Sequence, residues 1–144
     1  MRRVSSVLMA IAPFLLVASA RAEDNFRFGL SPGPRLVGTR AQSSGGGLLT
    51  AKLSGNMLSL DGTYAGLLGV PTAARLLGGP APGVRGAKIA DLTISPAVSG
   101  TISGNIKLGG KELAAFHKGG LYIEIDSANA PDGDLWGWVM PPSE

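Results

Sequence analysis

Four side chains that could hold a metal ion lie close together near the C-terminal end of the chain: Asp126, Asn129, Asp132 and Asp134. Carboxylate and amide oxygens of this kind are the ligands that calcium prefers. Their spacing does not match that of an EF-hand loop, and turn formation and strand ends explain the same residues. The sequence leaves calcium binding open and assigns no metal ligand.

Chemistry based on histidine or cysteine has little to build on. His117 is the only histidine and there is no cysteine, whereas a copper or zinc site made of imidazoles needs several histidines. A Ser-His-Asp hydrolase would need His117 as its base and a serine in a Gly-x-Ser-x-Gly turn, which the chain lacks. We interpret His117 as a solvated residue at the end of a short helix. We expect a protein that is not an enzyme, without catalytic residues or cofactors.

Three aromatic residues, Tyr122, Trp136 and Trp138, are the candidates for partner binding. If exposed, their rings would form a flat platform suited to a protein or a sugar. The alternative is that they pack under a loop or complete a thick core, because tryptophan is seldom left fully exposed.

A predicted β-hairpin over residues 121–139 positions these rings. Aliphatic residues alternate with Tyr122, Glu124 and Asp126 on its first arm, which is the pattern of a strand with one buried face. The segment 127–133, ending in Pro-Asp-Gly, is predicted to be the turn. The predicted pairs are Asp126 with Asp134, Ile125 with Leu135, Glu124 with Trp136, Ile123 with Gly137, Tyr122 with Trp138 and Leu121 with Val139.

Short alternating segments separated by Gly- and Pro-rich turns fill the rest of the chain. We predict strands near residues 26–30, 48–53, 57–64, 87–94 and 101–108, a strand or helical turn at 72–77, and one short helix at 111–118. Seven or eight short strands at this spacing indicate an all-β antiparallel sandwich.

The N-terminus has the features of a secretory signal peptide. Arg2 and Arg3 precede an apolar stretch, and Ala20-Arg21-Ala22 fits a small-x-small cleavage site. The apolar stretch is shorter than the roughly 20 residues of a spanning helix, although an uncleaved anchor remains the alternative. We expect residues 1–22 to be a signal peptide and 23–144 to be one domain, secreted or periplasmic.

Charge and cysteine content limit the partners. The chain has 13 basic and 10 acidic residues, but three of the arginines lie in the signal segment, so the predicted mature chain is formally neutral. A nucleic-acid partner is therefore not expected. The absence of cysteine excludes disulfides and a lipid-anchored lipoprotein, and we expect membrane contact only through the signal peptide.

A series of motifs carries a family resemblance. These motifs are Tyr64-Ala65-Gly66-Leu67, Thr72-Ala73-Ala74, Pro80-Ala81-Pro82-Gly83, Ser99-Gly100-Thr101-Ile102-Ser103-Gly104, Gly120-Leu121-Tyr122-Ile123-Glu124-Ile125 and Pro131-Asp132-Gly133-Asp134-Leu135-Trp136-Gly137. In this order they resemble a chordin-type (CHRD) domain over nearly the whole predicted mature chain, 26–140. Such domains are repeated in chordin, an extracellular antagonist of bone morphogenetic proteins, and occur singly in exported bacterial proteins.

The resemblance implies an immunoglobulin-like sandwich related to copper–zinc superoxide dismutases. The chain departs from the family where members carry histidines, because Arg75, Leu77 and Asp126 stand at those positions; Asp134 and Trp136 replace a common Glu and Arg. We expect an exported, non-enzymatic module that binds an extracellular or envelope protein or glycan. The alternative is a metal-binding or redox protein that has lost its histidine site.

Overall fold

The computed structural model describes residues 24–33 and 43–143. The predicted signal peptide and its cleavage site lie outside these residues. The described chain forms β1 (Asp24–Pro32), β2 (Gly46–Ser54), β3 (Met57–Ala65), β4 (Pro71–Gly78), β5 (Ala87–Asp91), β6 (Thr93–Ile94), β7 (Gly100–Lys107), α1 (Gly110–His117), β8 (Leu121–Ser127) and β9 (Ala130–Trp138). Within this part of the chain, no helix has the length and apolar character needed to cross a bilayer.

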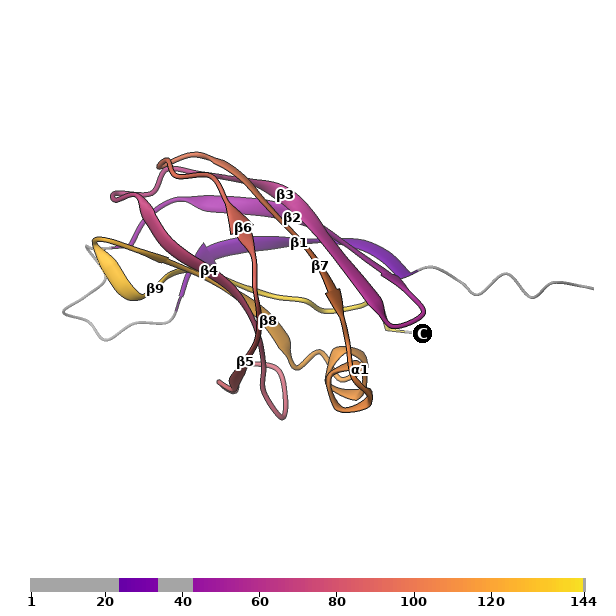
Figure 1. The fold of residues 1–144 in the computed structure, drawn as a ribbon. Helices are drawn as coiled ribbons and strands as arrows, with labels where there is room; N and C mark the ends of the chain where they lie inside the picture. The colour runs from indigo at the N-terminus through magenta and orange to yellow at the C-terminus, as the bar shows by residue number, and fades with distance from the viewer. Residues whose placement is uncertain (1–23, 34–42, 144) are drawn as a thin grey trace, which may run out of the picture.

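The strands form one antiparallel sheet that nearly closes on itself. Its order is β5-β4-β8-β9-β1-β2-β3-β7-β6, and β1 joins the two halves by pairing with both β2 and β9. The two edge strands, β5 and β6, are consecutive in the chain and separated only by Leu92, whose N–H donates to the carbonyl of Ala74 (2.8 Å). Figure 1 shows β1, β2 and β3 as an upper layer, with β8 below it.

The core lies between the two halves of the sheet. Every second residue of the strands points inward, as Leu49, Ala51 and Leu53 do on β2, and these side chains are almost fully buried. Helix α1 lies at one end (Figure 1), where the buried Phe116 packs against Phe26 with ring centroids 6.0 Å apart. The alternating pattern in the sequence therefore corresponds to a single buried core.

The all-β prediction is confirmed, with differences in detail. The described residues hold nine antiparallel strands, not seven or eight, in a nearly closed, barrel-like sheet. The predicted strand at 87–94 is divided at Leu92, because the chain crosses there from one sheet edge to the other. The ambiguous segment 72–77 is strand β4, and the helix is found within one residue of its prediction.

The closing hairpin has the predicted register along most of its length. Four predicted pairs are present: Tyr122 with Trp138, Ile123 with Gly137, Glu124 with Trp136 and Ile125 with Leu135. Val139 also donates its N–H to the Leu121 carbonyl, as that register requires (2.9 Å).

The predicted turn of this hairpin, residues 127–133, contains the observed turn but is too long. The strands are connected by only Ala128 and Asn129, and Pro131 lies inside β9. Ser127 closes the turn, because its Oγ accepts the N–H of Ala130 (3.2 Å). From the Ser127–Ala130 pair to the Ile125–Leu135 pair, β8 moves along by two residues whereas β9 moves along by five. The extra residues of β9 form a bulge, so Asp126 does not pair with Asp134.

Tyr64 fastens the link around residues 95–97 to the core. Its buried hydroxyl lies 2.7 Å from the carbonyls of both Ser95 and Ala97. Burial raises the pKa of Tyr64 above its ordinary value of 10.0, against a smaller lowering by the hydrogen bond to Ala97. The folded protein therefore holds this proton more tightly than the unfolded chain does.

Tyr64→Phe should lower the free energy of unfolding by about 1 kcal/mol at neutral pH, because one hydrogen-bonding group is lost. The wild-type contribution is complete below the unfolded pKa, about 10, and is lost as the pH rises through the folded value. Urea unfolding at about pH 7 and about pH 11 should therefore show a smaller alkaline loss in the variant than in wild type. Equal losses in the two proteins would contradict this role.

Candidate functional site

The predicted partner-binding residues lie on one face of β4, β8 and β9, opposite the core. Arg75 on β4 pairs with Glu124 on β8, and Glu124 in turn pairs with Trp136 on β9. Because side chains alternate along a strand, Tyr122 and Asp126 share this side. We call this side of the three strands the outer face; it carries Arg75, Tyr122, Glu124, Asp126, Trp136 and Trp138.

The three aromatic rings form a contiguous group on the outer face. Tyr122 stacks on Trp136 with parallel rings, 5.6 Å between centroids, and lies 4.6 Å from Trp138. Tyr122 and Trp136 are only 1% and 9% exposed, and Trp138 is half-buried. Of the two arrangements left open by the sequence, the structure has the packed one and not the exposed platform.

The loop between β4 and β5, residues 79–86, covers part of this group. The N–H of Gly86 donates to Tyr122 Oη (3.1 Å), and the guanidinium carbon of Arg85 lies 4.2 Å from the centre of the Trp136 ring. The loop closes tightly at its base, where a Cβ on Gly86 would collide with the carbonyl oxygen of Gly78. The loop is therefore held both at its base and above the rings.

A cluster of charges lies beside the rings. Arg75 Nη2 contacts Asp126 Oδ2 directly and lies 3.5 Å from Glu124 Oε1. Arg85 Nη2 lies 3.6 Å from the other Glu124 oxygen, Oε2. The carboxylate side chains are only 9% and 6% exposed, whereas Arg85 is 63% exposed. Two buried carboxylates are thus neutralised by one arginine of the sheet and one of the loop.

Two buried polar atoms of this cluster, Arg75 Nε and Asp126 Oδ1, have no hydrogen-bond partner within the part of the chain that the structure describes. A buried donor or acceptor without a partner is destabilising, and most are satisfied in folded proteins. The outer face therefore retains unused hydrogen-bonding capacity, which distinguishes it from a simple second core.

Asp134 has a structural role apart from this cluster. It is fully buried and accepts hydrogen bonds from Ser127 Oγ (2.6 Å), Ser43 Oγ (2.9 Å) and the Ser44 N–H (3.2 Å). These bonds fasten the residues just before β2 and the turn of the closing hairpin to the bulge in β9.

The four oxygen-bearing residues considered as calcium ligands do not form one site. Asp126 faces Arg75, Asp134 faces the serines, and Asp132 and Asn129 are exposed. Within residues 24–33 and 43–143, no three His, Cys, Asp or Glu side chains form a group able to hold a metal ion. The four side chains therefore face different partners and do not converge on one place.

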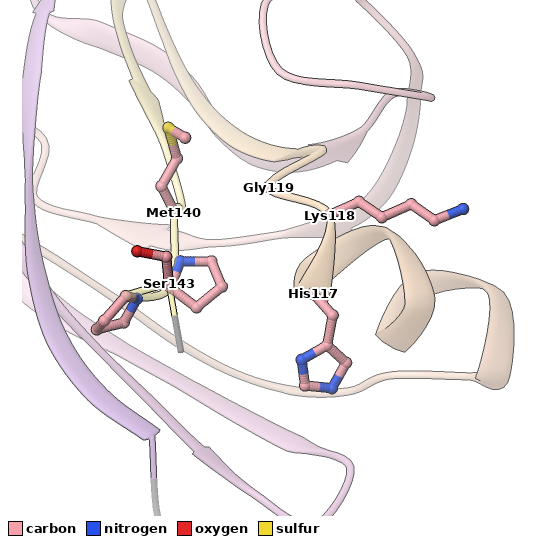
Figure 2. A pocket seen from close by; sticks show the side chains of 7 residues that line it. His117, Lys118, Gly119, Met140 and Ser143 are labelled. Atoms are coloured by element: carbon pink, nitrogen blue, oxygen red, sulfur yellow. The ribbon is translucent and has the colours of Figure 1, made fainter.

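His117 lies at the exposed end of α1, as predicted, and its ring packs edge-on against Phe116 (5.4 Å). It lines an open pocket of about 520 Å³ with Lys118, Gly119, Met140, Pro141, Pro142 and Ser143. Figure 2 shows the His117 and Lys118 side chains pointing in different directions. Among the described residues, none that lines this pocket is a carboxylate able to orient His117 as a base.

The positions at which the resemblance places histidines are brought together on the outer face. Arg75 pairs with Glu124, and Leu77 pairs with Tyr122. Asp126 lies two residues beyond Glu124 on β8 and therefore on the same side of the strand. In this chain the guanidinium group of Arg75 lies there, beside the carboxylates of Glu124 and Asp126.

Sequence reasoning missed Glu124 and Arg85 as parts of the site, and treated Arg75 only as a departure from the family. Arg75 and Glu124 are 49 residues apart, so only the β4–β8 pairing brings them together. Arg85 lies in a Gly- and Pro-rich loop whose path has no sequence periodicity. A usable signal was the presence of opposite charges in the predicted strand of the closing hairpin and in the segment 72–77, which was expected to be a strand or a helical turn.

Comparison with protein families matches residues 26–139 to the CHRD domain. The match extends from β1 to the residue after β9 and includes the outer face and the loop that covers it. Comparisons with curated proteins and with solved structures found no match. On the strength of the family match, this chain belongs to the CHRD domain family.

Proposed function

We propose that the protein is an exported, non-enzymatic binding module and that the outer face of β4, β8 and β9 is its binding surface. The partner class that we propose is an extracellular or cell-envelope protein or glycan. Export is proposed from the N-terminal signal features, Arg2-Arg3 and Ala20-Arg21-Ala22. We also propose that the nearly closed sheet is a distorted immunoglobulin-like sandwich, with its two halves joined through β1.

The observation that carries the proposal is the pair of buried carboxylates, Glu124 and Asp126, beside the aromatic rings. Burying ion pairs is often no better for stability than burying apolar residues of similar volume. Aromatic walls with a few converging polar groups are typical of binding sites. The composition of this face therefore supports recognition more than it supports packing.

The covering loop is suited to moving aside. It contacts the outer face through Arg85 and Gly86, and Val84 is 45% exposed. Gly83 has a positive φ of 80°, which allows a sharp turn at the tip. Such a loop can expose the rings without disturbing the core on the opposite side of the sheet.

Binding should depend on the outer face and not on other surfaces. We would test fluorescently labelled exported protein, expected to begin at Glu23, against arrays of envelope glycans and of acidic, neutral and basic peptides. Trp136→Phe should weaken binding to any ligand found by about tenfold, since aromatic anchors dominate such sites. Lys107→Ala, an exposed position on β7, is the control and should leave binding unchanged.

Two results would contradict the proposal. One is the absence of binding to every class on the arrays by both wild type and Arg85→Ala, which releases the loop. The other is a ligand whose affinity is unchanged by Trp136→Phe but reduced by Lys107→Ala. Circular dichroism of each variant would show that its fold is retained.

A further inference from the structure

Arg85 occupies a small cage formed by the outer face. Its guanidinium carbon lies 4.2 Å from the centre of the Trp136 ring. Its Nη2 atom lies 3.6 Å from Glu124 Oε2 and donates to the carbonyl oxygen of Asp132 (3.3 Å). An aromatic face, a carboxylate and a carbonyl together complement the flat, positively charged guanidinium group.

The cage and its occupant come from different parts of the protein. Glu124 belongs to β8, and Trp136 and Asp132 belong to β9, so the sheet fixes the walls. The Trp136 ring is further held by parallel stacking on Tyr122. Arg85, in contrast, projects from the 79–86 loop and is 63% exposed. The walls are therefore preformed, while the group that fills them is on a loop.

The contacts that hold Arg85 are of kinds that are weak at a surface. A cation–π contact and an ion pair contribute little when the cation itself is largely exposed, as Arg85 is, because water competes for the charge. When Arg85 leaves, the positive charge 3.6 Å from Glu124 Oε2 leaves with it. The Glu124 carboxylate and the Trp136 face would favour another cation at the same place.

We propose that this cage binds an arginine side chain of a basic partner protein, and that Arg85 occupies the cage in cis until the partner displaces it. The inference deepens the binding function proposed above and rests on it. Arginine is favoured over lysine because its planar group can stack on Trp136 while donating to both oxygens. Arg85 then competes with the partner from within the same chain. The apparent affinity of the wild type for a partner falls in proportion to the fraction of molecules whose cage is free of Arg85.

The test uses Nα-acetyl-arginine methylamide as the probe and its citrulline analogue as an uncharged control of the same shape. Binding to the mature protein is followed by NMR through the two tryptophan indole N–H signals. Arg85→Ala should bind the arginine probe about tenfold more tightly than wild type does, because the tethered competitor is gone. Lys88→Ala is the matched control: it removes a nearby positive charge that pairs with Asp91 and does not contact Trp136.

A second variant checks the wall of the cage. Adding Glu124→Gln to Arg85→Ala should reduce the gain, because the carboxylate is lost while its shape is kept. Equal binding of the arginine probe by wild type and Arg85→Ala would overturn the inference. So would equal binding of the arginine and citrulline probes, or the same gain in Lys88→Ala. Binding of a glycan or an acidic peptide through Trp136 on the arrays would then leave the proposed function standing without the arginine site.

Discussion

Arg75→Ala should lower the free energy of unfolding by about 2–4 kcal/mol. The substitution removes the guanidinium that contacts the buried Asp126 carboxylate and one of the cations beside Glu124, and removing the partner of a buried charge is strongly destabilising. We place the loss toward the lower end of this range, because the Arg75 side chain is 30% exposed and water can partly replace it. Urea unfolding at neutral pH measures the effect directly.

The Arg75 prediction has a close control. Lys88→Ala breaks the ion pair with Asp91 on the neighbouring strand β5, where both side chains are more than half exposed. That change should cost less than about 0.5 kcal/mol. Part of the Arg75→Ala loss should also be recovered at acid pH, where protonation removes the buried negative charges. A loss as small as that of Lys88→Ala would mean that the carboxylates are solvated and that the outer face is open.

Ile125→Ala should cost about 2–5 kcal/mol, because Ile125 is fully buried at the centre of β8 and its truncation leaves a cavity. Ile94→Ala on the short edge strand β6 is the matched control and should cost less, since Ile94 is only half-buried. Thermal or chemical unfolding compares the two variants. Similar losses at both positions would contradict the placement of the core between the two halves of the sheet.

Trp136→Ala should destabilise the protein to a similar extent as Ile125→Ala. An exposed platform would have implied a clearly smaller loss, but Trp136 is 9% exposed and packs against both Tyr122 and Arg85. The native emission of the two tryptophans should accordingly be blue-shifted. The rings therefore contribute to stability when the loop is closed, and their proposed binding role requires the loop to open.

The closing hairpin shows what the sequence can predict. Its alternation of aliphatic and polar residues determined the register, because a shift of one residue would have put Ile123 and Ile125 on the wrong face. Gly137 was expected to resist enlargement against Ile123. The position is indeed filled, but a Cβ there would meet Gly29 O at 2.6 Å and would collide with Leu30, both on β1. Alternation predicted the face of the sheet on which Gly137 lies. It could not predict that the neighbours there come from β1, because that depends on the contact between β1 and β9.

The turn and the site could not be predicted in the same way. Pro-Asp-Gly at 131–133 has typical turn composition, yet the turn forms before it, at Ala128 and Asn129, where Ser127 bonds both the Ala130 N–H and Asp134. The charge cluster depends on the pairing of β4 with β8 and on the path of the 79–86 loop. Neither is encoded in local periodicity, because both depend on contacts between residues far apart in the chain.

The most direct measurement is acrylamide quenching of Trp136 in a Trp138→Phe background, where Trp136 is the sole tryptophan. Trp136 should be shielded when Arg85 is present and become accessible in Arg85→Ala, while urea unfolding shows the same folded core in both proteins. The contradicting result is equal quenching with and without Arg85. The 79–86 loop would then not be a movable cover, and the outer face would not be a binding surface that opens.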